Sequence, residues 1–134
     1  LPVSPGAHSE AVQINTGGGV VGGDRLNFSV KAEAETTVVY ATQAAERIYR
    51  SAGPLAELGV HLDIDHRATL AWLPQEAILY SGARVKRSFD ADVADDGRLL
   101  LVDTIVFGRV ASGETMGDGL LGDAWRIRRG DAPN

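Results

Sequence analysis

Short stretches in which apolar and polar residues alternate recur along this chain, and they constrain its fold more than any other feature. The clearest are residues 26–30, 59–65 and 89–93, where apolar side chains occupy every second position. A period of two is typical of a β-strand that buries one face, whereas an amphipathic helix repeats about every 3.6 residues. The sequence therefore predicts a mainly β protein.

Composition and apolar runs predict further strands. Residues 36–42 are rich in β-branched side chains, residues 70–73 and 77–80 are short apolar runs, and residues 124–129 also suit a strand. Residues 99–107 are almost wholly apolar, which predicts a central strand buried on both faces. The predicted fold class is mainly β, with stacked, mostly antiparallel short strands and few helices.

Turn signals separate the predicted strands. Residues 33–35 are typical of a turn, and Asp95-Asp96-Gly97 is typical of a hairpin-type turn. Residues 108–122 contain five glycines and predict a loop. Residues 43–50 suit either a helical face or a strand end, so their structure stays open at this point.

A glycine-rich segment raises the question of nucleotide binding. Gly17, Gly19 and Gly22 stand at the spacing G-x-G-x-x-G, which in dinucleotide-binding proteins lies between a strand and a helix. That helix supplies the N–H groups and the dipole that hold a pyrophosphate. Here a predicted strand follows the glycines instead. We therefore expect them to form tight turns, and we expect no binding of NAD, FAD or ATP.

The composition argues against several classes of protein. The 134 residues suit one domain, and a net charge of −5 without a basic cluster argues against nucleic acid or a membrane as a partner. No apolar run is long enough to span a membrane, and the chain has no cysteine for disulfides or thiolate metal sites. We expect a soluble, cytoplasmic protein.

Residues 1–10 contain two prolines and polar side chains, and they predict a loose N-terminal arm. Residues 11–134 predict a single β domain. Because the chain begins with leucine rather than methionine and ends in a polar run, we interpret it as a fragment, a partial domain.

Polar side chains in two places could carry chemistry. His61, Asp63 and Asp65 would project from one face of a strand and could bind a divalent metal ion, although a solvated strand face is the simpler interpretation. Glu76 and Asp103 lie in apolar surroundings, where a carboxylate is costly unless it has a salt-bridge partner or a function. The available partners are Arg84, Arg87 and Arg109. No serine lies in a nucleophile elbow, and we expect no enzyme.

Four segments, taken together and in order, resemble a known family. They are NTGGG followed by GGDR in residues 15–25, TQAAERIYR in residues 42–50, WLPQE followed by GAR in residues 72–84, and GR followed by SGE in residues 108–114. In this order and spacing they resemble the UreD family of urease accessory proteins, called UreH in some bacteria. The resemblance covers residues 11–129. Members usually carry a further N-terminal strand region and a long C-terminal part, which agrees with a fragment.

The resemblance implies a nearly all-β protein that acts in urease maturation and turns over no substrate. Such a protein is a scaffold that binds the urease structural subunits on one side and UreF on the other, and UreF recruits the GTPase UreG. Nickel would pass through an internal water-filled channel to the urease active site. The resemblance thus implies transient nickel and no tightly bound cofactor. The alternative is a small β sugar- or metal-binding module unrelated to urease.

The resemblance also implies which residues line the nickel path. A channel for a metal ion needs oxygen and nitrogen ligands that bind weakly enough to release the ion. The candidates are Asp24, Thr42, Gln43, Glu76, Arg109 and Glu114, with Arg109 orienting Glu114. The structural glycine loop that presents Asp24 consists of Gly17, Gly18, Gly19, Gly22 and Gly23.

Overall fold

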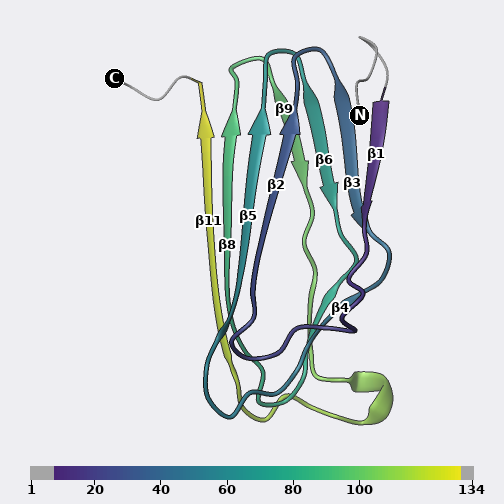
Figure 1. The fold of residues 1–134 in the computed structure, drawn as a ribbon, viewed down its shortest axis with the longest axis vertical. Helices are drawn as coiled ribbons and strands as arrows, with labels where there is room; N and C mark the ends of the chain where they lie inside the picture. The colour runs from purple at the N-terminus through teal and green to yellow at the C-terminus, as the bar shows by residue number, and fades with distance from the viewer. Residues whose placement is uncertain (1–7, 131–134) are drawn as a thin grey trace.

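A computed structural model describes residues 8–130, which form eleven strands and one short 3-10 helix at Val110–Ser112 (Figure 1). The strands lie in three sheets, each named here by a central strand. The β3 sheet consists of β1 (His8–Gln13), β3 (Thr37–Thr42), β6 (Thr69–Leu73) and β9 (Arg98–Leu101). The β5 sheet consists of β2 (Arg25–Ala32), β5 (Ala56–Ile64), β8 (Arg84–Val93) and β11 (Leu120–Arg129). The β7 sheet consists of β4 (Glu46–Ile48), β7 (Ala77–Leu79) and β10 (Ile105–Phe107).

The chain visits the three sheets in turn and so builds a solenoid-like stack of coils. It passes from the β5 sheet to the β3 sheet, then to the β7 sheet, and back to the β5 sheet. Each strand therefore pairs with a strand one coil away: Arg25 lies opposite Glu57, and Glu57 lies opposite Lys86. All pairings between these strands are parallel (Figure 1).

The predicted, mostly antiparallel arrangement is therefore wrong. Alternation reports which face of a strand is buried, and it is the same whether the neighbouring strand is parallel or antiparallel. The turn predicted at Asp95-Asp96-Gly97 does form, but it carries the chain from β8 to β9 in a different sheet, so no hairpin results.

The predicted strand positions and faces are largely confirmed. Residues 26–30 lie in β2 with their apolar side chains turned inward, and Val60, Leu62 and Ile64 of β5 are buried. The segment left open at residues 43–50 contains the strand β4. β1 begins at His8, so residues 8–10 of the predicted arm belong to a strand, while residues 1–7 lie outside the described residues.

The central strand predicted for residues 99–107 is wrong. Two short strands, β9 and β10, occupy this range, and residues 102–104 carry the chain between them from the β3 sheet to the β7 sheet. Both strands lie at a sheet edge, where Leu100 and Phe107 are 54% and 52% exposed. A continuous apolar run does not distinguish a buried strand from an edge strand with an apolar outer face.

The core lies between the sheets in two clusters. Leu62, Leu70 and Trp72 are buried between the β3 and β5 sheets. The second cluster lies between the β7 sheet and the N-terminal ends of the strands in the β5 sheet. Its largest members are Val20, Ile48, Leu79 and Val85. Both clusters come from alternate, inward-pointing strand positions, and burial of this apolar surface is the main force that holds the coils together.

The outer face of the β5 sheet is polar, and its charges pair with one another. Arg126 donates a hydrogen bond to Asp90 at 3.0 Å, and Arg128 donates one to Asp92 at 2.5 Å. These pairs join β8 and β11 at opposed register positions. The exposed His61 of β5 lies on the same face, 3.9 Å from Asp92. This face is thus a solvated, self-neutralised surface.

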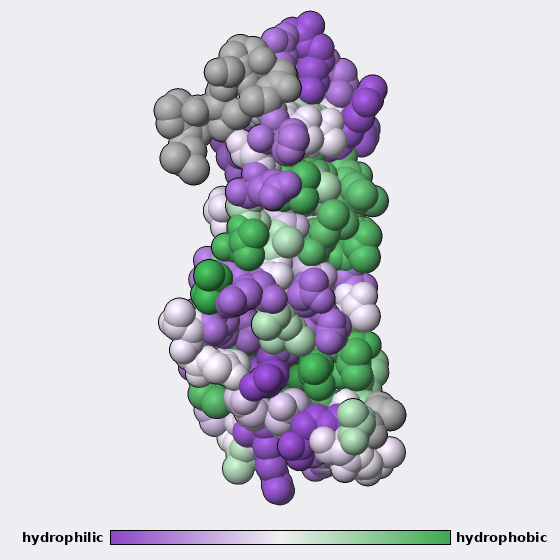
Figure 2. Space-filling view, turned by 90° about the vertical axis from the view of Figure 1, so that its right-hand side faces the viewer, coloured by the Kyte–Doolittle hydropathy of each residue, from purple (hydrophilic) through white to green (hydrophobic). Residues whose placement is uncertain are grey.

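Part of the outer face of the β3 sheet is apolar instead. One outward row consists of Val12, Ala41 and Leu73, and a second adds Val39, Ala71 and Leu100 to the exposed Glu10. The remaining outward row, of His8, Thr37, Thr69 and Arg98, is polar. Val12 and Leu100 are 58% and 54% exposed. Figure 2 looks onto the β1 end of the molecule and shows two hydrophobic patches along its right-hand side, separated by more hydrophilic residues. Contiguous exposed apolar surface of this kind is typical of faces that contact other proteins.

Within the part of the chain that the structure describes, no helix has the length and apolar character needed to cross a membrane.

Candidate functional site

The glycine-rich segment forms a loop that stacks on β4. Val20 donates its N–H to the Arg47 carbonyl at 2.7 Å, and Tyr49 donates its N–H to the Val20 carbonyl at 2.9 Å. Gly19 has a φ of 146°, and a Cβ there would lie 2.4 Å from the Tyr49 ring. Only glycine allows so close an approach. The loop leads into the strand β2, so it lacks the helix N-terminus of a dinucleotide site.

Side chains close both ends of this loop. Asn15 Oδ1 accepts a hydrogen bond from the Gly17 N–H at 2.9 Å. At the other end, Asp24 Oδ2 accepts one from the Val21 N–H, also at 2.9 Å. Because these short polar side chains satisfy backbone donors within the turn, they fix the loop's shape. The packing of Gly19 against Tyr49 gives this loop a structural reason for its glycine.

A polar groove of about 150 Å³ lies between this loop and the bend from β3 to β4. Gly18 and Gly19 form one wall, and residues 42–47 form the other. Gln43 is exposed in the groove, and its N–H donates to the Gln13 carbonyl at 2.9 Å. The groove therefore presents backbone and side-chain oxygens to solvent.

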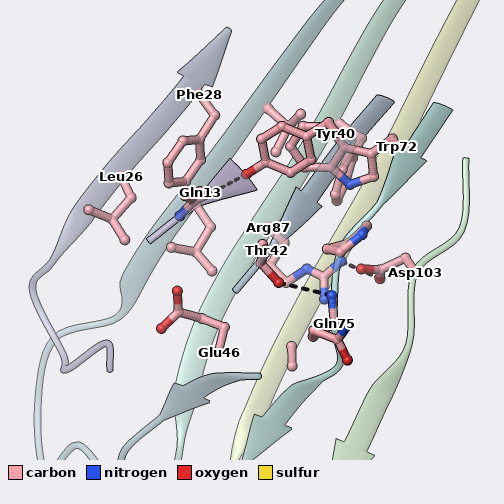
Figure 3. A pocket seen from close by; sticks show the side chains of 15 residues that line it. Gln13, Leu26, Phe28, Tyr40, Thr42, Glu46, Trp72, Gln75, Arg87 and Asp103 are labelled. Atoms are coloured by element: carbon pink, nitrogen blue, oxygen red, sulfur yellow. Dashed lines mark hydrogen bonds and ion pairs between the residues drawn. The ribbon is translucent and has the colours of Figure 1, made fainter. Parts of the chain in front are cut away.

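A half-open cavity of about 80 Å³ adjoins the groove, between the β3 and β5 sheets (Figure 3). Aromatic and aliphatic side chains form most of its wall. The polar side chains that line it are Gln13, Tyr40, Thr42, Glu46, Gln75, Arg87 and Asp103. Three of them, Gln13, Thr42 and Glu46, line the groove as well. These three side chains form a wall that the groove and the cavity share.

Glu46, the first residue of β4, is the carboxylate of that wall. Its Oε1 accepts a hydrogen bond from Asn15 Nδ2 at 2.9 Å, which ties it to the glycine loop. Burial raises the pKa of Glu46, while hydrogen bonds from Asn15 and from the backbone of Arg47 act in the opposite direction. Among residues 8–130, no cationic side chain forms an ion pair with Glu46.

Tyr40 provides a neutral hydrogen-bond donor beside this carboxylate. Its hydroxyl donates to Gln13 Oε1, and its ring stacks on Trp72 with centroids 3.8 Å apart. Burial, and secondly the charge of Glu46, raise the pKa of Tyr40 to about 12. The phenol therefore stays protonated at neutral pH and holds the Gln13 amide at the cavity wall.

The far end of the cavity holds a buried ion pair. Arg87 is only 4% exposed and pairs through Nη2 with Asp103, while its Nε lies 3.7 Å from Asp123. The guanidinium carbon lies 5.5 Å from the centre of the Phe89 ring. Trp72 Nε1 is buried, with no hydrogen-bond partner among the described residues. The cavity thus contains one paired carboxylate, one unpaired carboxylate and an unused N–H donor.

Two of the predicted path residues lie at this site. Thr42 lines both the groove and the cavity, where its hydroxyl accepts from the Gln75 N–H at 2.9 Å and donates to the Ala44 carbonyl at 3.0 Å. Gln43 lines the groove. Asp24 closes the glycine loop next to β2 and lines neither space.

The other three predicted path residues line neither the cavity nor the groove. Arg109 and Glu114, which the resemblance placed together, form an ion pair with Nε and Oε2 2.7 Å apart, and Arg109 also lies over the Tyr80 ring at 4.6 Å. The hydrogen bond to Arg109 lowers the pKa of Glu114. The Glu76 carbonyl accepts the Glu46 N–H at 2.9 Å, and Glu76 stands between Gln75 and Ala77, which line the cavity although Glu76 does not. Their part in a nickel path stays a prediction.

The weak metal candidates do not converge on one point. His61 and Asp63 lie on the outer face of β5, while Asp65 lies in the turn that follows it. Asp65 Oδ1 accepts the His66 N–H at 2.7 Å. No group of three or more histidine, aspartate or glutamate side chains within residues 8–130 could hold a metal ion.

Sequence reasoning missed three residues that shape the site: Gln13, Tyr40 and Glu46. Arg87 was one of the salt-bridge partners considered for the carboxylates in apolar surroundings, and it pairs with Asp103. Glu46 lies in the segment whose structure stayed open between helix and strand, so its direction was not predictable. One feature of the sequence could have identified Gln13. It lies at the end of an apolar stretch just before the glycine-rich segment, as Thr42 lies at the end of a strand just before the bend to β4. In the structure Gln13 and Thr42 are opposite each other in the β3 sheet.

Fold and site together define a class of protein: a solenoid-like, parallel β protein in which a polar groove adjoins a half-open cavity between two sheets. The profile of the family described as UreD urease accessory protein matches residues 2–134. The chain therefore belongs to the UreD urease accessory protein family, and the resemblance inferred from its motifs is confirmed.

Individual relatives agree with the family match. The chain is 48% identical over 120 residues to the urease accessory protein UreD of Rhodopseudomonas palustris strain CGA009, covering 90% of this chain and 43% of the relative. It is 47% identical over 130 residues to UreD of Methylobacterium sp. strain 4-46, covering 97% and 46%. It is 46% identical over 130 residues to UreD of Azorhizobium caulinodans, covering 97% and 48%. The chain thus spans about half the length of these curated relatives.

Proposed function

We propose that this protein acts in urease maturation, as a scaffold between the urease structural subunits and a UreF–UreG complex and as a conduit for nickel. In this role it is not an enzyme. Nickel is its transient cargo rather than a resident cofactor, and the protein works in the cytoplasm. Membership of the urease accessory family supports the general role.

One observation carries the conduit proposal. Gln13, Thr42 and Glu46 line both the groove and the cavity, so one set of oxygen-bearing side chains faces both spaces. Amide, hydroxyl and carboxylate oxygens bind a borderline ion such as Ni²⁺ more weakly than thiolates or imidazoles would. A wall of this composition suits an ion that must enter and leave.

The apolar outer face of the β3 sheet supports the scaffold proposal. Val12 and Leu100 are more than half exposed there, whereas the β5 sheet covers its own outer face with ion pairs. Solvation of a large apolar sheet face is unfavourable, and contact with a protein partner removes that surface from water. An exposed apolar surface on the β3 sheet and a polar one on the β5 sheet suit a protein that contacts a partner through the first and water through the second.

Deletion and complementation test the proposal. The gene for this protein is deleted in its urease-positive host, and the nickel content and activity of purified urease are measured with and without a plasmid copy. We expect urease from the deletion strain to be folded but nickel-poor, and we expect a tagged copy to co-purify with UreF. Normal nickel content in urease from the deletion strain would contradict the proposal, and stand-alone binding of a sugar would favour an unrelated β module.

A further inference from the structure

Glu46 is the only carboxylate in the described cavity wall that is free to bind an incoming cation. Two carboxylates line this cavity, and Arg87 already neutralises the other one, Asp103. Glu46 has one identified side-chain partner, the neutral amide of Asn15. A half-buried carboxylate without a cation is unfavourable unless a ligand compensates it, and this one faces both the groove and the cavity.

The chemistry of the cavity wall shows why a side-chain ligand is needed. Aromatic and aliphatic side chains form most of that wall and cannot solvate a cation. An ion that moves against them gives up contacts with water, and the oxygen atoms of the wall have to replace those contacts.

The wall offers suitable replacements next to Glu46. Gln13 Oε1 is held in place by the Tyr40 hydroxyl, and Thr42 Oγ1 is held by the Gln75 N–H. Both of these oxygens belong to side chains that line the groove and the cavity. With Glu46 they would supply one carboxylate and two neutral oxygens to a divalent cation, which is weaker ligation than a closed metal site.

We propose that Glu46 is the entry ligand for a divalent cation passing from the groove to the cavity, and that Asn15 occupies its carboxylate while no ion is present. This inference rests on the proposed conduit function and assigns its entry point. In this proposal the glycine loop affects ion binding through Asn15. The Asn15 amide must release the Glu46 carboxylate before that carboxylate binds the ion. Asn15 is thus a positioning residue, and Glu46 is the ligand.

Substitutions of Glu46, Asn15 and a remote glutamate separate these roles. The variants Glu46→Gln, Glu46→Asp and Asn15→Ala replace the wild-type gene, and Glu33→Gln is the matched control because Glu33 is an exposed turn residue beside Lys31. Each protein is purified in its complex with UreF, and its affinity for Ni²⁺ alone is measured by equilibrium dialysis. The nickel content of urease from cells grown in limiting nickel is the second measurement, and the thermal midpoint is the third.

We expect Glu46→Gln to weaken Ni²⁺ binding about tenfold or more, since even indirect partners of metal ligands change affinity by this amount. Glu46→Asp should give an intermediate loss, and Asn15→Ala should bind Ni²⁺ at least as tightly as the wild type because a competitor is removed. Thermal midpoints should stay near that of Glu33→Gln. Unchanged affinity and urease nickel in both Glu46 variants would overturn this inference while leaving the conduit intact. Nickel-replete urease without any copy of the gene would instead overturn the conduit itself.

Discussion

Arg87 and Asp103 form a buried ion pair at the inner end of the cavity, joining β8 to the segment that connects β9 and β10. The arginine is 4% exposed and the aspartate side chain 10%. A pair this deeply buried gives little net stability by itself, because both groups lose their hydration, but removing one partner leaves an uncompensated charge. The pair therefore holds the β9–β10 crossover in place against the β5 sheet.

Asp103→Asn should destabilise the fold by about 3–5 kcal/mol, because it leaves the buried Arg87 guanidinium unpaired. Asp123→Asn is the matched control: Asp123 lies beside the same arginine, but its oxygen is 3.7 Å from Nε, beyond hydrogen-bond distance. Denaturant unfolding of the two purified variants measures the difference. Equal losses in both variants would show that Asp103 is not the principal partner of Arg87.

Much of the strand pattern was predictable from the sequence, because the alternation depends only on which face of a strand is buried. Val60, Leu62 and Ile64 illustrate this, since each is apolar and each is buried. The direction of the neighbouring strands was not predictable. It is set by the crossovers between sheets, and residues 95–97 form the same kind of turn whether the chain returns beside β8 or crosses to another sheet.

The site was predictable only in part, for a related reason. Thr42 and Gln43 belong to a motif that the resemblance to the family pointed to, and they lie at the groove. Glu46 gains its significance from the stacking of coils, which brings Asn15 of one coil to within 2.9 Å of it. No local pattern in the sequence reports a contact between residues one coil apart.

Titration at high pH tests the environment of Tyr40. Its folded-state pKa of about 12 lies above the ordinary value of 10.0. The unfolded chain therefore loses this proton first, and the linkage makes stability fall as pH rises between those two values. Ultraviolet difference spectra should show a late phenolate transition that disappears in Tyr40→Phe, and the variant should lose less stability over this range. Ionisation of every tyrosine near pH 10 would contradict the buried hydrogen bond to Gln13.

A charge on the apolar outer face should impair assembly without unfolding the protein. Leu100→Asp places a carboxylate at a position that is 54% exposed, so the fold should keep its thermal midpoint within a few degrees. Binding to a protein partner should fall, because the charge would have to be desolvated at the interface. Co-purification with UreF and with urease subunits, measured separately, identifies which partner is lost. Ser29→Asp on the polar outer face is the control, and equal recovery of both partners in both variants would exclude the β3 face as an interface.

The last prediction concerns why the loop contains glycine at two adjacent positions. Gly18 and Gly19 both have positive φ, at 78° and 146°, but they differ in their surroundings. A Cβ at Gly18 would meet nothing within 4 Å, whereas one at Gly19 would lie 2.4 Å from the Tyr49 ring and 2.7 Å from the Arg47 carbonyl oxygen.

Gly18→Ala should therefore cost about 1 kcal/mol or somewhat more through backbone strain alone. Gly19→Ala should cost clearly more, because the loop must also move away from β4, and it should shift Asn15 relative to Glu46. Thermal unfolding of both variants measures the first effect, and Ni²⁺ affinity measures the second. If the two alanine variants were equally stable and bound Ni²⁺ alike, the close packing of the loop on β4 would not be what positions Asn15 at the cavity wall.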